Sequence, residues 1–121
     1  MEVTDLMVGD LVIKHTATRG DMVCTVTPCI INSYEFDWSQ IPTTAEILAK
    51  NFKLSGYDRY YVGKDLYVKW YDNDTFGFGK MNDAYNEPQF ESFAKVNSVH
   101  ELQHALRVVG LKDVANKLIV E

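Results

Sequence analysis

Two histidines one helical turn apart are the residues of this sequence that most directly suggest chemistry. His100 and His104 flank Glu101 in the order His-Glu-x-x-His. On a helix this spacing brings both imidazoles to one side, where they can hold a zinc ion, and the glutamate can take a proton from the metal-bound water. The motif therefore gives one hypothesis for the function, a zinc-dependent hydrolase.

Three features of the neighbouring residues argue against this hypothesis. Ser98 stands three residues before Glu101, which is a capping box, so the glutamate carboxylate is expected to engage the start of the helix. A catalytic zinc needs a third protein ligand, and no histidine follows His104. Arg107 lies beside the histidines, where its charge would repel a metal. The remaining candidate ligands, none at a typical spacing, are His15, Cys24, Cys29 and Glu121. We therefore predict no metal, no cofactor and a polar helix face in solvent.

Local signals define three helices around this motif. Ser98 should begin a helix whose apolar stripe is Val99, Leu102, Leu106 and Val109, and Gly110 should end it in a left-handed conformation. A second short helix is expected from Leu111 to Leu118. Earlier in the chain, Thr43 and Glu46 form another capping box and predict a helix that ends near Asn51.

The rest of the chain has the alternating pattern of β-strands. Met7–Lys14, Met22–Thr27 and Cys29–Tyr34 resemble the opening of a small SH3-like barrel in pattern. Tyr57–Val62, Leu66–Tyr71, Thr75–Met81 and Gln89–Val96 predict an antiparallel meander. We predict a single α+β domain over residues 1–121, with a β-rich part at 1–40, then a helix, the meander and a C-terminal helix packed on the sheet at 41–121.

One face of the second meander strand is the candidate binding site. Tyr67, Lys69 and Tyr71 alternate with apolar residues and therefore share a face. Aromatic rings beside a cation can stack on and pair with a nucleotide-like ligand, whereas exposed tyrosines on a strand also serve as sheet packing or a partner surface. Gly77 and Gly79 in the next strand suggest close approach by another backbone, a helix or a ligand, and a bend beneath a helix is favoured.

Composition and charge exclude several classes of function. The chain has 121 residues, a formal net charge of −5 and no cluster of lysine and arginine along the sequence, which argues against nucleic acid as a partner. It shows no charged and apolar leader and no long apolar run, so we expect a cytoplasmic protein without membrane contact. No nucleophile and base, phosphate loop or complete metal set can be assembled from the sequence.

Two longer segments carry a resemblance. Ile41–Phe52 and Val96–Leu111, together with the Val-Gly-Asp-Leu-Val start at Val8–Val12, resemble a group of small uncharacterised proteins of gut bacteria and their phages and mobile elements. In that group the second histidine of the motif is often replaced, for example by asparagine, which is incompatible with a shared zinc site. The resemblance implies a phage or mobile-element context and no established activity.

The sequence thus favours a non-enzymatic binding or interaction protein with an unknown protein or small-molecule partner. A nucleotide-binding or nucleotide-sequestering protein and the zinc hydrolase remain the alternatives.

Overall fold

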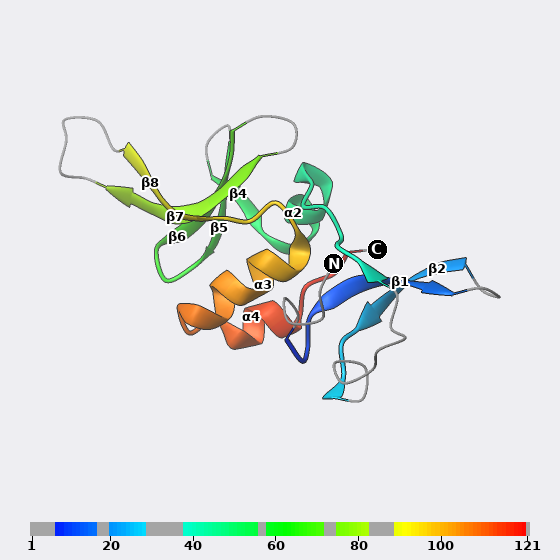
Figure 1. Ribbon diagram of the computed structural model, residues 1–121. Coiled ribbons are helices and arrows are strands. Elements are labelled where there is room, and N and C mark those ends of the chain that lie inside the picture. Colours follow the sequence, from blue (N-terminus) through cyan, green and yellow to red (C-terminus); the bar gives the residue numbers. More distant parts are fainter. Residues whose placement is uncertain are drawn as a thin grey trace.

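The computed structural model describes residues 7–16, 20–28, 38–55, 58–71, 75–82 and 89–120. Figure 1 shows a small and a large antiparallel sheet with a central helix, α3, between them. The strands are β1 (Leu11–Thr16), β2 (Gly20–Thr25), β3 (Trp38–Ser39), β4 (Lys53–Ser55), β5 (Arg59–Gly63), β6 (Leu66–Trp70), β7 (Phe76–Asn82) and β8 (Gln89–Lys95), and the helices are α2 (Ala45–Asn51), α3 (Val99–Val108) and α4 (Lys112–Asn116). The predicted α+β class with a C-terminal helix is confirmed.

The small sheet has the strand order β2-β1-β3. Its hairpin pairs β1 with β2 from Leu11 opposite Thr25 to Thr16 opposite Gly20. Sequence reasoning did not predict β3, which has only two residues. The strand expected at Cys29–Tyr34 lies outside the described residues, so the SH3-like interpretation stays a prediction. A minor core of Val12, Val26 and Trp38 fills one face of this sheet.

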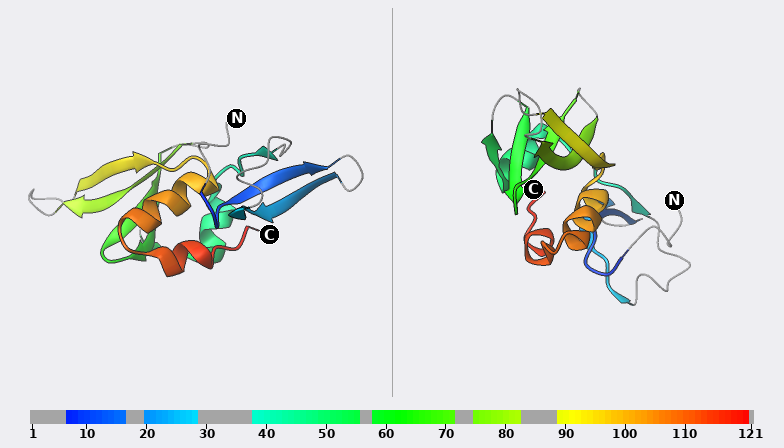
Figure 2. Two further views of the ribbon diagram at one scale, coloured as in Figure 1. Left: turned by 60° about the horizontal axis from the view of Figure 1, so that its bottom comes forward. Right: turned by 90° about the vertical axis from the view of Figure 1, so that its left-hand side faces the viewer.

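The large sheet has the order β4-β5-β6-β7-β8, and the meander predicted from Tyr57 to Val96 forms its last four strands. One face packs on the helices: Tyr60, Val68 and Phe78 join Leu48 of α2 and Leu102 of α3 in the main core. Figure 2 shows α2 and α3 on this inner side of the sheet. The opposite face, called the outer face below, has no described helix against it.

The ends of α3 follow the sequence prediction. The Ser98 hydroxyl oxygen accepts from the Glu101 backbone N–H at 3.4 Å and begins the helix. Val99, Leu102 and Leu106 are fully buried, as the stripe requires. Gly110 has a φ of +84°, and Lys64 Nζ lies 3.3 Å and 3.4 Å from the carbonyl oxygens of Val109 and Gly110. A cation at this position offsets the negative end of the helix dipole.

The start of α2 is one residue later than predicted. Thr44, not Thr43, is the capping residue, and its hydroxyl oxygen accepts from the Ile47 backbone N–H at 3.1 Å. The Thr43 hydroxyl instead donates to the carbonyl oxygen of Val96 at 2.7 Å. Thr43 was therefore a wrong cap prediction because its side chain joins the approach to α2 to the residues before α3.

Candidate functional site

The side of α3 that carries His100 and His104 contacts the residues just before β1. Asp10 is completely buried, and its carboxylate lies 2.7 Å from His104 Nε2 and 2.6 Å from Arg107 Nη1. The Met7 backbone N–H donates to the same carboxylate at 2.8 Å. A carboxylate withdrawn from water requires such partners, since an unpaired buried charge is costly. This side of the helix therefore has a structural role.

Gln103 extends the same attachment. Its side chain is almost fully buried, and Oε1 accepts from the Leu11 backbone N–H at 2.7 Å. Its Nε2 donates to the carbonyl oxygens of Gly9 at 3.1 Å and Ala115 at 3.2 Å. One amide thus satisfies three backbone groups from two segments far apart in the sequence. We call Asp10, Gln103, His104 and Arg107 the attachment cluster.

The predicted solvated helix face is therefore wrong. His100 is 4% exposed and packs edge-on against Trp38, with ring centroids 5.8 Å apart. Helical periodicity placed the histidines away from the apolar stripe, but it could not show that the small sheet covers this second side. Polar groups can be buried when they have hydrogen-bond partners.

The same contacts bear on the zinc hypothesis. The Glu101 carboxylate accepts a hydrogen bond from the Ser98 hydroxyl at 2.7 Å, and His104 Nε2 contacts Asp10. Within the described residues, no three His, Cys, Asp or Glu side chains are grouped so that they could hold a metal ion. His15 lies on the small sheet, Cys24 on β2, and Cys29 and Glu121 outside the described ranges. The arrangement favours attachment over zinc binding.

Zinc should therefore have little effect on the protein. We expect protein purified without added metal to contain far less than one zinc per chain, and zinc addition to leave the thermal midpoint unchanged, because the best candidate ligands are already hydrogen-bonded. Metal analysis and thermal unfolding measure this. Stoichiometric zinc that is lost in His104→Ala would contradict it.

The outer face of the large sheet gathers the predicted binding residues with others that sequence reasoning missed. Strand register sets Lys53 opposite Tyr61 and Tyr61 opposite Tyr67, so that these three form one row across β4, β5 and β6. A second row joins Arg59 to Lys69. Directly paired residues in antiparallel strands project from the same face. The three candidates Tyr67, Lys69 and Tyr71 thus become part of a larger surface.

Aromatic side chains surround Lys69 on this face. Its Nζ lies 5.1 Å from the centroid of the Tyr71 ring and 5.7 Å from that of Phe90. The Tyr71 and Phe90 rings contact edge to face at 6.2 Å, and Tyr61 and Tyr67 do so at 5.4 Å. In an edge-to-face pair, the ring that contributes its edge keeps its own faces available for stacking. The face therefore combines ring surface with a cation that is only partly exposed.

Three cations of the outer face form no ion pair with a carboxylate of the described residues. The ion pairs among the described residues involve His15, Lys50, His104 and Arg107, and none involves Lys53, Arg59 or Lys69. Arg59 instead reaches across the face to Met81, with Nη1 2.8 Å from Sδ. In a chain of net charge −5, three such cations on one face are a local excess of positive charge. We define the binding face as Lys53, Arg59, Tyr61, Tyr67, Lys69, Tyr71 and Phe90.

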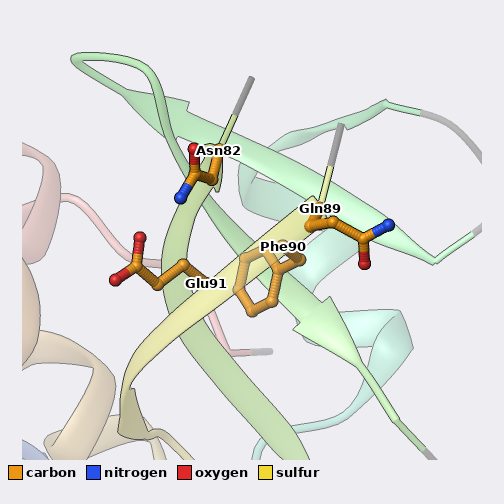
Figure 3. Close-up of a pocket in the computed structure, with 4 residues that line it drawn as sticks. All are labelled: Asn82, Gln89, Phe90 and Glu91. Carbon is orange, nitrogen blue, oxygen red and sulfur yellow. The ribbon is translucent and has the colours of Figure 1, made fainter. Parts of the chain in front are cut away.

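Two hollows lie at the edges of the large sheet. One, of about 600 Å³, lies at the end of the β7 and β8 pair. Figure 3 shows the Asn82 and Glu91 side chains extending to one side and that of Gln89 to the other. The Phe90 ring lies between them. The other, of about 530 Å³, is a groove between β8 and α3, where Phe93 and Val108 are largely exposed. The first adjoins the binding face through Phe90, whereas the groove is apolar and suits a protein partner.

Comparison with known proteins does not assign this chain to a family. No protein-family model, curated protein or solved structure matches this chain. None of the helices in the described ranges has the length and apolar character needed to cross a lipid bilayer.

Proposed function

We propose that this protein is a binding protein whose binding face takes a small anionic ligand with a flat ring, of the nucleotide class. The observation that carries the proposal is the combination, on one sheet face without a described covering element, of four aromatic side chains and three cations that form no ion pair with a described carboxylate. Phosphate groups would pair with the cations, and a base would stack on a tyrosine.

The geometry also limits the size of the ligand. Lys53, Arg59 and Lys69 occupy two adjacent rows over β4, β5 and β6 and form a patch rather than a long channel. Single-stranded nucleic acid offers the same phosphate and base chemistry, but its binding sites follow the backbone along a positively charged groove. We therefore expect a free nucleotide to fit the patch better.

Lys69 provides a direct test of this proposal. We expect the wild-type protein to bind ATP, and Lys69→Ala to weaken the affinity about 10-fold, since loss of one charge-assisted contact is about 1.4 kcal/mol or more. Isothermal titration calorimetry measures both, with a short thymidine oligonucleotide as a second ligand. Tighter binding of the oligonucleotide than of ATP would assign the face to nucleic acid instead.

Lys80→Ala is the matched control, because Lys80 lies on β7 of the same sheet, opposite Leu66 and Glu91 rather than among the binding-face residues. Its affinity for ATP should equal that of the wild type. Equal losses in Lys69→Ala and Lys80→Ala would show only a general charge effect, and absence of any binding by the wild type would reject the proposal.

A protein partner and a phage or mobile-element context remain predictions from the sequence. The groove between β8 and α3, with its exposed apolar side chains, would suit a protein partner.

A further inference from the structure

Three side chains on the small sheet form a hydrogen-bonded row that neither the binding face nor the attachment cluster uses. His15 on β1 lies between Asp21 on β2 and Ser39 on β3. His15 Nδ1 is 2.6 Å from Asp21 Oδ1, and His15 Nε2 is 2.9 Å from Ser39 Oγ. Both distances lie within the range of direct hydrogen bonds.

Strand pairing explains why these residues meet. His15 stands directly opposite Asp21, and Ile13, two residues earlier on β1, stands opposite Ser39. Residues two apart on a strand share a face, so all three side chains project from the same face of the small sheet. His15 is six residues from Asp21 and 24 from Ser39 in the sequence, so no local pattern predicted this row. A serine, a histidine and an aspartate thus meet on one face, a grouping that the sequence did not indicate.

From this geometry we propose that Ser39 is a nucleophile activated by His15 and Asp21. The Asp21 carboxylate accepts the Nδ1 proton of His15 and thereby fixes the neutral ring with Nε2 as the acceptor. Nε2 then accepts the hydrogen bond from the Ser39 hydroxyl and can take its proton. These are the roles in a serine, histidine and aspartate relay, which is recognised by geometry rather than by order along the chain.

The reaction class that fits is acyl transfer from a small activated ester. As the bond from Ser39 Oγ to the carbonyl carbon forms, the hydroxyl proton passes to His15 Nε2. His15 then gives that proton to the leaving alcohol as the ester bond breaks, which leaves an acyl-serine. A water molecule attacks the acyl group with His15 again as the base, and the carboxylic acid and free Ser39 are released.

Neighbouring residues indicate which acyl group would be accepted. Ile13 and Val23 lie on the same face, opposite Ser39 and each other, and both are half-buried against the main core. They give an apolar wall next to the serine. A short aliphatic acyl chain would contact this wall, whereas a charged one would lose hydration there.

If the row had only a stabilising role, replacing its residues would change stability and nothing else. The His15 and Asp21 side chains are 34% and 67% exposed, and pairs this accessible to solvent add little stability. Variants in the row should therefore fold, which allows reactivity to be measured separately from folding.

The test uses a fluorophosphonate probe, which forms a bond from phosphorus to Oγ and releases fluoride. We expect the full chain to be labelled at Ser39, as located by peptide mass spectrometry, and Ser39→Ala to be unlabelled. Asp21→Asn should fold normally, as measured by circular dichroism. Its rate of labelling should fall at least about 100-fold, because the substituted side chain no longer orients the His15 base. The rate of p-nitrophenyl acetate hydrolysis should fall in the same order, from the wild type to Asp21→Asn to Ser39→Ala.

Ser92 is the internal control. Its hydroxyl lies on β8 and donates to the carbonyl oxygen of Ala94 at 3.4 Å. Absence of label at Ser39, equal labelling of Ser39 and Ser92, or an unchanged rate in folded Asp21→Asn would each overturn the proposal.

Discussion

Replacing Asp10 with alanine is expected to lower the free energy of unfolding by about 3 to 4 kcal/mol, because removal of one partner from a buried ion pair leaves the other without compensation. Arg107 would lose its carboxylate partner while its side chain is only 13% exposed, and the Met7 N–H would lose its acceptor. Chemical denaturation monitored by circular dichroism measures the change.

Asp113→Ala is the matched control for this experiment. Asp113 is also an aspartate but lies exposed in the first turn of α4, where loss of its favourable position near the helix dipole should be about 1 kcal/mol or less. Similar losses in the two variants would contradict a specific role for Asp10, and so would an Asp10 variant as stable as the wild type.

Gly79→Ala is expected to destabilise the protein by about 3 kcal/mol, at the upper end for overpacking. A Cβ at Gly79 would lie 1.9 Å from the carbonyl oxygen of Glu91, which is backbone of β8. The register of β7 and β8 shifts at this position, which brings the two backbones together. β8 must therefore move before any side chain fits. Thermal unfolding and amide hydrogen exchange of β8 measure the effect.

Gly77→Ala on the same strand separates backbone from side-chain interference. A Cβ there would lie 2.7 Å from Cε2 of the Tyr71 ring, which can rotate away, so we expect a loss of about 1 kcal/mol. Equal losses of stability in Gly77→Ala and Gly79→Ala would contradict this expectation, because they would show that the β8 backbone is free to shift.

The features that the sequence predicted depend on short-range signals. The cap at Ser98, the stripe of α3 and the glycine stop at Gly110 each involve residues within about one turn, so their spacing alone defines them. The meander followed from alternation and turn residues in the same way. Gly77 and Gly79 did mark a close approach, but a tyrosine ring and the β8 backbone make it rather than a helix.

The features that it missed depend on strand register and on contacts between distant segments. Asp10 and Arg107 are 97 residues apart, and nothing local marks either as the partner of the other. Lys53 and Arg59 appeared as isolated cations because β4 is too short for a periodic signal. Only the register of β4, β5 and β6 places them beside Lys69. The candidate site was thus predicted at Tyr67, Lys69 and Tyr71, and its charged surroundings were not.

The most direct test of the proposed function is to map the nucleotide contact by NMR. Titration of the isotope-labelled full chain with ATP should produce saturable shifts that centre on Arg59, Tyr61, Tyr67 and Lys69 of the binding face, with little change in α4. Saturable shifts confined to the groove between β8 and α3, or no shifts at millimolar ATP, would contradict the assignment of this face as the ligand site.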